Sequence, residues 1–447
     1  MKTDSKISVF GLGKLGCTML ACFAHKGAKV VGVDINPDSV SKINKGLSPI
    51  YEPGVEDLIK KNIDKIKATS DVAEAVANSS ASFIIVPTPS EANGSFNTKA
   101  VEAVAKSIGA ALKNKTGYHL IIVTSTVLPG DTARITGLLE ETSGKKCNVD
   151  FGVCYNPDFI ALGSIVRDFL NPDMVLIGES DKKAGDALCD IHKNLVDNKP
   201  SINRMTFENA ELTKIALNSY CTLKITFANV LAEICEKFPG GNVNAVTQAL
   251  GFDTRIGHRY LKGGLSYGGP CFPRDNKAFA WTASKLGVTH SLALKTDEVN
   301  NFHRDNRIPA KLLSILKEKK ADSIAVLGLT YKADTTLVEE SAAISVIKTL
   351  AKENIKISVY DPAGMNEGKA ALSDCENVIF KESAKDCIKG ADLCFIASPW
   401  KEFGELTKGD FKSLMKSPVV FDAWSMFDFA SEKEIDYRQI GKYSETK

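Results

Sequence analysis

The stretch Ile7–Gly16 (ISVFGLGKLG) decides the fold. A short apolar run leads into three glycines spaced Gly-x-Gly-x-x-Gly, and an apolar stretch of helical length follows. A second strand-like run, Lys29–Val33, then ends at Asp34. Strand, glycine turn, helix, strand and terminal acid in this order are typical of a Rossmann unit. Such a unit predicts a parallel sheet that helices cover on both faces.

The same glycines and Asp34 predict a dinucleotide site. Gly11 permits the tight turn, Gly13 lets the backbone approach a pyrophosphate, and Gly16 permits close packing of helix and strand. The Asp34 carboxylate would bind an adenosine ribose and repel a 2′-phosphate, so NAD is favoured over NADP. The alternative is a plain strand–helix turn, but the strand before the glycines and the acid after them favour the dinucleotide.

The rest of the chain predicts three parts. Strand-like runs continue the alternation and repeat it in the last third, at 82–86, 119–123, 174–177, 323–328, 357–361 and 391–399. Between them, 206–238 holds neither glycine nor proline and has apolar residues near the helical period, so we expect one helix of about 30 residues. The predicted class is α/β: two Rossmann-like doubly wound domains joined by a central helical block with one long helix. We expect an NAD-binding domain at 1–204, a helical domain at 205–305 and the second Rossmann-like domain at 306–447.

The composition excludes several classes of protein. Of 447 residues, 44% are hydrophobic and 25% charged, as in an ordered globular protein. The 56 Lys and Arg nearly balance the 54 Asp and Glu, so we predict no nucleic-acid partner and no membrane surface. No apolar run reaches the roughly 18 residues of a membrane helix, and the polar N-terminus predicts no signal peptide. The 11 cysteines form no CxxC pair and the six histidines show no metal spacing, so we expect a reduced, cytoplasmic protein without a metal.

Cys271 lies in an unusual loop, Gly268–Asp275 (GGPCFPRD). Glycines and prolines around one cysteine predict a rigid loop, and Arg274 with the local backbone favours the reactive thiolate. Asp275 has the chemistry to orient a water or exchange protons. The residues alone leave two interpretations open: a nucleophile, or a buried structural cysteine.

Lys214 and Asn218 are four residues apart in the expected long helix, so they share one face. An amine and an amide on one face could hold an oxyanion during hydride transfer. The alternative is a pair of solvated surface residues.

Thr88, Ser125 and Thr126 follow two of the strand-like runs directly. Ligands of doubly wound sheets lie beyond the carboxyl ends of the strands. The position therefore predicts a cofactor crevice for these hydroxyls, with a turn that contacts no ligand as the alternative.

These motifs, in this order, resemble the nucleotide-sugar 6-dehydrogenases, the UDP-glucose and GDP-mannose dehydrogenase family. The resemblance covers nearly the whole chain, and the Cys271 loop is its most specific marker. The loop looks closer to the UDP-glucose branch than to the N-acetylhexosamine branches. The markers are Gly11–Gly16, Pro49–Gly54, Ser125–Val127, Tyr155–Phe159, Glu208–Asn218, Arg255–Gly257, Gly268–Asp275, Gly328–Lys332 and Tyr360–Pro362.

The resemblance implies an NAD domain, a central helical block that forms a homodimer and a C-terminal UDP-sugar domain. It also implies two successive NAD-dependent oxidations of a sugar C6 alcohol. Cys271 would capture the intermediate aldehyde as a thiohemiacetal, a second oxidation would give a thioester, and water would release the uronate. In the family, such uronates usually feed polysaccharide synthesis.

The resemblance assigns roles to individual residues. The implied catalytic residues are Cys271, Lys214, Asn218, Asp275, Thr126 and Asp158. The implied NAD contacts are Gly11, Gly13, Leu15, Gly16, Asp34, Thr88, Ser125 and Thr126. The implied substrate contacts are Phe159, Lys214, Asn218, Arg255, Tyr260, Gly268 and Lys332, with Arg255 reaching the substrate of the neighbouring subunit.

Besides a mild change at Asp158, where the family usually has a glutamate, two residues depart from the family pattern. UDP-glucose enzymes usually carry a glutamate that contacts the catalytic water where this chain has Leu162, so hydrolysis must depend on Asp158, Asp275 or another group. The family usually has a cofactor-contacting arginine where this chain has Glu339.

Three alternatives remain open from the sequence. The same chemistry could act on a UDP-N-acetylhexosamine or GDP-mannose. A single-step hydroxyacid-type dehydrogenase would need neither Cys271 nor the last part of the chain. A non-catalytic NAD-binding homologue would explain Leu162 and Glu339, but not why Cys271, Lys214, Asn218 and Asp275 occur together.

Overall fold

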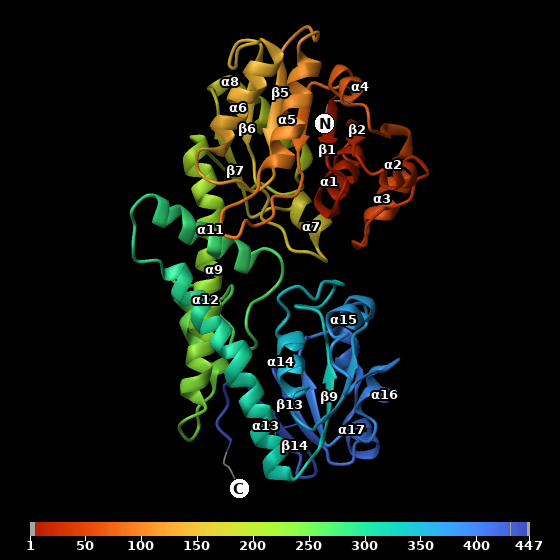
Figure 1. Ribbon diagram of the computed structural model, residues 1–447, viewed down its shortest axis with the longest axis vertical. Coiled ribbons are helices and arrows are strands. Elements are labelled where there is room, and N and C mark those ends of the chain that lie inside the picture. The colour runs from red at the N-terminus through yellow and green to blue at the C-terminus, as the bar shows by residue number, and fades with distance from the viewer. Residues whose placement is uncertain (1–4, 430, 445–447) are drawn as a thin grey trace. The chain divides into compact units, whose positions relative to one another are not determined.

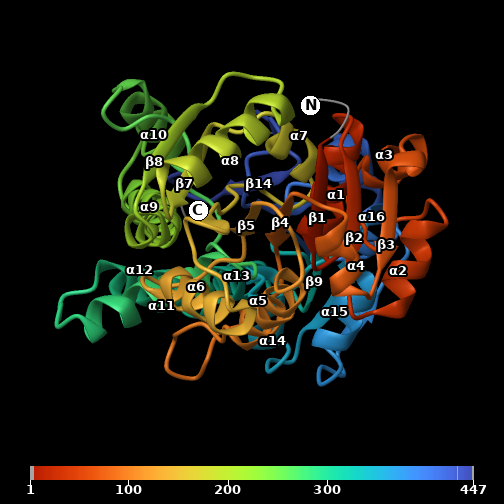
Figure 2. The same ribbon diagram turned by 90° about the horizontal axis from the view of Figure 1, so that it is seen from above.

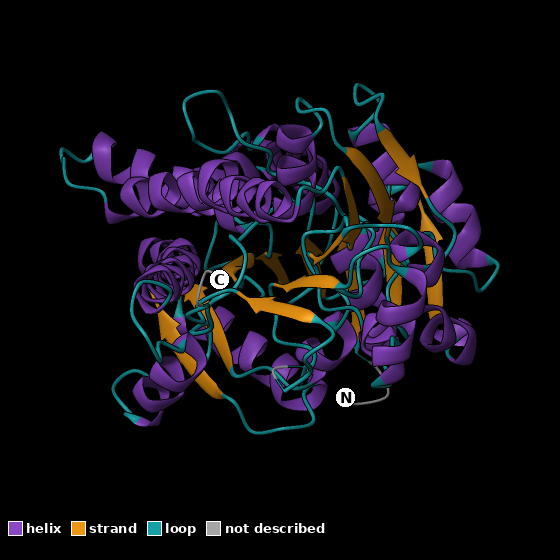
Figure 3. Ribbon diagram, turned by 90° about the horizontal axis from the view of Figure 1, so that it is seen from below, coloured by secondary structure: helices purple, strands orange, loops and turns teal. Residues whose placement is uncertain are grey.

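The computed structural model describes residues 5–429 and 431–444 (Figure 1). The chain divides into two compact units between Ala216 and Leu217. Each unit contains one sheet whose strands are flanked by helices (Figure 3).

The sheet of the first unit has eight strands in the order β3-β2-β1-β4-β5-β6-β7-β8 (Figure 2). All neighbours are parallel except β6 and β7, which pair antiparallel. The chain leaves β1 in one direction to form β2 and β3 and returns to the other side of β1 for β4, so a topological switch point lies beside β1. The strands are β1 Lys6–Phe10, β2 Lys29–Val33, β3 Ile66–Thr69, β4 Ala81–Ile84, β5 His119–Val123, β6 Phe151–Tyr155, β7 Met174–Glu179 and β8 Ser201–Met205.

Helices cover both faces of this sheet because side chains of a strand alternate between the faces. Ile7 and Val9 of β1 pack in one core cluster, with α1, α3 and α8, whereas Phe10 packs in the other, with α5 and α6. Both faces are therefore buried, as a parallel sheet requires. The helices are α1 Lys14–His25, α2 Pro37–Asn44, α3 Val55–Lys61, α4 Val72–Ala77, α5 Lys99–Leu112, α6 Asp131–Ser143, α7 Ile165–Leu170 and α8 Lys182–Leu195.

A single helix, α9 (Phe207–Cys235), runs through the sequence position at which the two units divide. It is 29 residues long and confirms the predicted long helix. The helical block continues with α10 Val243–Phe252, α11 Phe272–Lys285, α12 Leu292–Phe302 and α13 Ile308–Lys319.

The sheet of the second unit has six parallel strands in the order β11-β10-β9-β12-β13-β14. Its order around β9 repeats that around β1, so the prediction of two Rossmann-like sheets is confirmed. The strands are β9 Ser323–Leu327, β10 Lys356–Tyr360, β11 Val378–Phe380, β12 Leu393–Ile396, β13 Val419–Asp422 and β14 Asp436–Gln439. The accompanying helices are α14 Ala342–Leu350, α15 Met365–Ala371, α16 Ala384–Ile388 and α17 Lys408–Leu414.

Candidate active site

The glycines at the end of β1 form a narrow turn with one open position. Gly11 has φ of +98°, and a Cβ there would lie 2.2 Å from the Ile85 carbonyl oxygen. A Cβ on Gly16 would lie 1.9 Å from the Gly11 carbonyl oxygen. At Gly13 an added Cβ would meet nothing within 4 Å, and this residue begins α1. Gly13 therefore leaves the helix N-terminus accessible to a pyrophosphate, and Leu15 lies half-buried in the first helical turn.

Asp34 follows β2 and faces the same turn. Its carboxylate accepts hydrogen bonds from the backbone nitrogens of Leu12, at 2.6 Å, and Asn36, at 2.8 Å. Each oxygen keeps a lone pair for a ribose hydroxyl. The residues at this switch point therefore fit NAD.

Ile35 was missed by sequence reasoning. It is 99% exposed, although it follows Asp34 directly. An apolar side chain next to the acid that is predicted to bind the ribose offers a surface on which an adenine can pack. The sequence pattern that could have identified this residue is an isoleucine between Asp34 and the turn that starts the next helix.

Thr88, Ser125 and Thr126 come together at the carboxyl ends of β4 and β5. The Ser125 hydroxyl accepts a 2.8 Å hydrogen bond from the Val86 backbone nitrogen, and the Thr88 hydroxyl donates at 2.8 Å to the Thr126 carbonyl. Thr88 and Ser125 are buried and Thr126 is half-buried. The first two hydroxyls therefore hold the two loops together, whereas Thr126 lies nearer the surface of this predicted crevice.

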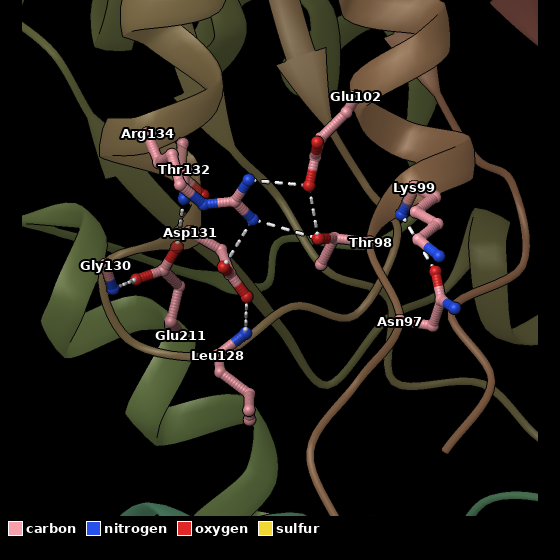
Figure 4. A network of polar contacts seen from close by, with 10 residues as sticks. All are labelled: Asn97, Thr98, Lys99, Glu102, Leu128, Gly130, Asp131, Thr132, Arg134 and Glu211. Atoms are coloured by element: carbon pink, nitrogen blue, oxygen red, sulfur yellow. Dashed lines mark hydrogen bonds and ion pairs between the residues drawn. The ribbon is translucent and has the colours of Figure 1, made fainter. Parts of the chain in front are cut away.

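A buried carboxylate joins this region to α9 (Figure 4). Glu211 accepts hydrogen bonds from the backbone nitrogens of Gly130, at 2.8 Å, and Thr132, at 2.7 Å, at the start of α6. The negative charge suits a helix N-terminus. Burial raises the pKa of Glu211, and these hydrogen bonds oppose the rise. Glu211 thus fixes the turn after Thr126 against the helix that carries Lys214. No local pattern in the sequence predicts this contact.

Arg134 completes the network of Figure 4. Its guanidinium donates to Glu102 at 2.6 Å and to the hydroxyl of Thr98 and the carboxylate of Asp131 at 2.9 Å each. Asp131 in turn accepts a 2.9 Å hydrogen bond from the Leu128 backbone nitrogen. The turn between β5 and α6 is therefore tied on one side to α5 and on the other to α9.

Lys214 is buried against the loop that follows β6. Its Nζ donates at 2.5 Å to the Asp158 carbonyl and lies 4.6 Å from the centre of the Phe159 ring. Oδ2 of Asp158 is buried and has no hydrogen-bond partner among the described residues. Burial raises the pKa of the Asp158 carboxyl to about 7, although Lys214 opposes the rise. The loop therefore holds an ammonium group beside a carboxyl that can carry a proton near neutral pH.

Cys271 is the N-cap residue of α11 and is exposed, whereas eight of the 11 cysteines are buried and two are intermediate. None of the 11, all of which the structure describes, forms a disulfide. The N-terminus of a helix favours a negative charge and hence the thiolate. The structure thus removes the alternative of a buried structural cysteine.

Asp275 lies one turn into α11 and is fully buried. Its Oδ2 accepts a 2.6 Å hydrogen bond from the Asn218 side chain, and its Oδ1 lies 2.8 Å from the Arg274 guanidinium. Arg274, which we expected to favour the Cys271 thiolate, therefore pairs with Asp275. The alternative of a solvated Asn218 is also excluded, because Asn218 is 9% exposed.

Two further predicted substrate residues lie close to the Cys271 loop. A Cβ on Gly268 would lie 2.1 Å from the Glu340 carbonyl oxygen, so only glycine fits there. Tyr260 has φ of +62°, and its ring centre lies 6.0 Å from that of Phe272.

Lys332 is half-buried next to a residue that contacts the Cys271 loop, whereas Arg255 lies at the surface. The Lys332 Nζ lies 5.8 Å from the ring centre of Tyr331, which packs beneath Gly269. Arg255 is highly exposed and pairs with Asp253 at 2.6 Å on its own loop.

The two departures from the family pattern lie in loops. Leu162 is half-buried, and the adjacent Gly163 donates its backbone nitrogen to Glu52 at 3.0 Å. Glu339 is exposed and accepts from the Gly269 backbone nitrogen at 3.1 Å through its carbonyl.

Neither a metal site nor a bilayer-crossing helix is visible in residues 5–429 and 431–444. No three His, Cys, Asp or Glu side chains gather there as metal ligands would. No helix of that part is both long and apolar enough to span a membrane.

Three domain models of the UDP-glucose/GDP-mannose dehydrogenase family match the chain. The NAD binding domain matches residues 5–196, the central domain 208–302 and the UDP binding domain 325–429.

Individual relatives agree with this result. UDP-glucose 6-dehydrogenase AglM of Haloferax volcanii is 34% identical over 93% of this chain and 96% of its own length. GDP-mannose 6-dehydrogenase of Pseudomonas syringae is 36% identical over 80% of each chain. The structure of a UDP-glucose dehydrogenase from Pyrobaculum islandicum superposes with a TM-score of 0.86 at 31% identity, covering 98% of both chains. The chain belongs to the UDP-glucose/GDP-mannose dehydrogenase family, and its cofactor is NAD.

Proposed function

We propose that this chain oxidises UDP-glucose to UDP-glucuronate in two NAD-dependent steps through a covalent bond to Cys271. The observation that carries the proposal is the exposed thiol at the start of α11, next to the buried Asn218–Asp275 pair. A dehydrogenase that stopped at the aldehyde would have no use for such a thiol.

NAD, held by the glycine turn and Asp34, would supply the hydride acceptor, one molecule for each of the two oxidations. In each oxidation the oxygen on C6 would give up its proton to a base of the site. The Cys271 thiolate adds to the C6 aldehyde, and the aldehyde oxygen takes up a proton, which gives a thiohemiacetal. Oxidation of this adduct gives a thioester; water then adds to C6, the C–S bond breaks, and the thiolate and the uronate are released.

The positively charged and amide groups would stabilise the oxygen at C6. Lys214 is an ammonium group and Asn218 an amide, one turn apart in α9, and both suit a developing oxyanion. Asp275 and Thr126 would orient water and transfer protons. Asp158, whose pKa burial raises to about 7, would accept a proton in place of the glutamate that Leu162 replaces.

The same proposal assigns the binding residues. The glycine turn and Asp34 would hold the pyrophosphate and ribose of NAD, with Leu15, Thr88, Ser125 and Thr126 along the crevice. The sugar nucleotide would contact Phe159, Lys214, Asn218, Arg255, Tyr260, Gly268 and Lys332.

We further propose a homodimer, a cytoplasmic location and the domain boundaries 1–204, 205–305 and 306–447. Tyr220, Phe227 and Ile234 support the dimer: they recur every seven residues along α9 and are 61%, 51% and 52% exposed. An apolar stripe on the exposed face of a helix favours contact with the same surface of a second copy of the chain. The absence of disulfides among the 11 cysteines supports a reducing compartment.

A second candidate substrate is GDP-mannose, with UDP-N-acetylhexosamines as a third. The 36% identity to a GDP-mannose 6-dehydrogenase favours the former. The reaction would be the same, since the groups at C6 do not depend on the nucleotide base.

The test is the amount of NADH formed per sugar consumed, with NAD in excess and limiting UDP-glucose. A ratio near two supports both substrate and mechanism, whereas a ratio near one contradicts the covalent second oxidation. No NADH would contradict UDP-glucose and direct the assay to GDP-mannose and UDP-N-acetylhexosamines. Cys271→Ser should lose uronate formation almost completely, and unchanged turnover of this variant would overturn the covalent mechanism.

A further inference from the structure

Side chains hold much of the loop that precedes Cys271, in addition to the backbone contact from the Gly269 nitrogen to the Glu339 carbonyl at 3.1 Å. Asn300 of α12 accepts from the Tyr267 backbone nitrogen at 3.0 Å and donates to the Tyr267 carbonyl at 3.1 Å. Asn229 of α9 makes the corresponding pair of contacts, with the Gly264 nitrogen at 2.9 Å and the Leu265 carbonyl at 3.2 Å. An irregular buried segment needs such partners because its backbone groups have none in a helix or sheet.

One carboxylate extends this arrangement to both sides of the cysteine. Oδ1 of Asp297, on α12, accepts a short hydrogen bond from the Tyr267 hydroxyl and a 2.8 Å hydrogen bond from the Asn276 side chain. Asn276 also donates to the Tyr267 hydroxyl at 3.0 Å. We call these three residues the Tyr267–Asn276–Asp297 cluster. Tyr267 precedes Cys271 by four residues and Asn276 follows it by five, so the cluster closes the segment that carries the thiol.

Two members of the cluster are buried, and Asp297 is half-buried. Tyr267 is 5% exposed and Asn276 is fully buried. The side-chain oxygen of Asn276 accepts a hydrogen bond from the Thr222 hydroxyl at 3.1 Å. Burial raises the pKa of Asp297, and the hydrogen bonds from Asn276 and Tyr267 oppose the rise. The one oxygen Oδ1 of Asp297 therefore accepts from residues on both sides of Cys271 and is a fixed point that they share.

The segment between the fixed points contains Gly268 and Gly269, residues with much conformational freedom in an unrestrained chain. Asp275, which precedes Asn276 in α11, is itself buried. The helix therefore continues into the core at this point. The thiol position therefore depends on what holds Tyr267 and Asn276 together.

We propose that Asp297 is a positioning residue for the Cys271 nucleophile: by accepting from both Tyr267 and Asn276 it fixes the loop on which the thiol lies. The role in turnover rests on the proposed function, whereas the position of the thiol does not. Loss of the shared acceptor leaves two buried donors unsatisfied and frees the loop. Rates at Cys271 then fall, while binding of the nucleotide part of the substrate is retained.

The experiment compares Asp297→Leu with Asp297→Asn, which keeps the acceptor oxygen, and with Tyr267→Phe, which removes one donor. Glu298→Leu is the matched control, because Glu298 is the next residue of α12 and its side chain is 67% exposed. Two rates are measured on the full chain: alkylation of Cys271 by iodoacetamide, followed on its peptide by mass spectrometry, and kcat and KM for UDP-glucose.

Asp297→Leu should slow both alkylation and kcat by about five- to tenfold with little change in KM. Asp297→Asn should restore both to within about twofold, and Tyr267→Phe should be intermediate. The proposal is overturned if a folded Asp297→Leu matches Glu298→Leu in both rates, or if Asp297→Asn is as slow as Asp297→Leu. If Asp297→Leu does not fold, Asp297→Asn and Tyr267→Phe decide, and equal rates in both overturn the proposal. If no sugar is turned over, the proposed function fails, but the order of alkylation rates still tests the position of the thiol.

Discussion

Two carboxyl groups of the first unit have contrasting environments. Asp34 lies at a strand end with backbone donors around it. Asp158 has a buried Oδ2 that the described residues leave without a donor. The two carboxyl groups therefore have different consequences when they are substituted, and burial penalises the charged form of Asp158.

For Asp158 we expect a pH-dependent cost to stability. Its pKa in the fold is about 7 and its ordinary value is 3.8, so the folded protein binds the proton more tightly than the unfolded chain does. Stability therefore falls as pH rises from about 4 to about 7 and is lowest when the carboxyl is ionised. Asp158→Asn should be more stable than the parent by about 4 kcal/mol at pH 8 and nearly equal to it at pH 4.

Urea unfolding of both proteins at the two pH values measures this difference. Asp38→Asn is the control, since Asp38 pairs with Lys42 on the surface of α2. A stability difference that does not grow with pH would show that the Asp158 carboxyl is well solvated.

Asp34 should determine both the affinity for NAD and the preference over NADP. Asp34→Asn removes the charge that repels a 2′-phosphate and weakens the acceptor for the ribose. We expect the Kd for NAD to rise about tenfold and the ratio of the NADP and NAD constants to fall. Isothermal titration with both cofactors measures this, and an unchanged ratio would place the ribose elsewhere.

Among the elements, α9 has the most connections: it contributes Glu211 to the start of α6, Lys214 to the loop after β6 and Asn218 to α11. Each of the three is at most 9% exposed. The helix thus organises several loops that carry predicted site residues.

Loss of the Glu211 carboxylate should loosen the turn between β5 and α6. Glu211→Ala leaves the backbone nitrogens of exposed Gly130 and buried Thr132 without their acceptor, at a cost of about 1–3 kcal/mol that comes mainly from Thr132. Glu208→Ala is the control, because Glu208 is exposed on the same helix. Hydrogen exchange of residues 130–132 should accelerate only in Glu211→Ala, and equal protection in both variants would mean that other groups hold the turn.

At the scale of the whole molecule, the features that could be predicted from the sequence are those with a local pattern. Contacts between residues that are distant in the chain could not be predicted. The glycine turn with Asp34 has a local sequence pattern, and so does the stretch 206–238, which contains neither glycine nor proline. Patterns of this kind predicted both sheets and the long helix. Glu211 and Asp297 have none, because their partners are 79 or more and 21 or more residues away in the chain. The antiparallel pairing of β6 and β7 was also not predicted, since strand direction depends on the connection and not on strand composition.

The proposed homodimer gives a prediction at this scale. Phe227→Glu puts a charge into the exposed apolar stripe of α9 and should convert a dimer into a monomer. Lys317→Gln, at an exposed position of α13, changes the net charge by the same amount and should leave the mass of the dimer unchanged. Light scattering after size exclusion measures the mass, and a dimer of Phe227→Glu would mean that this stripe is not the interface.

The crowding of Gly268 and Gly269 has a consequence for evolution. A Cβ at Gly268 would meet the Glu340 carbonyl oxygen at 2.1 Å, and one at Gly269 would meet the Tyr331 ring at 2.5 Å. Every missense change of a glycine codon introduces a Cβ, so each meets the same obstacle whatever its chemistry. Lineages that acquire a new sugar preference must therefore vary around these two codons, and random mutagenesis libraries should recover active clones with both glycines intact.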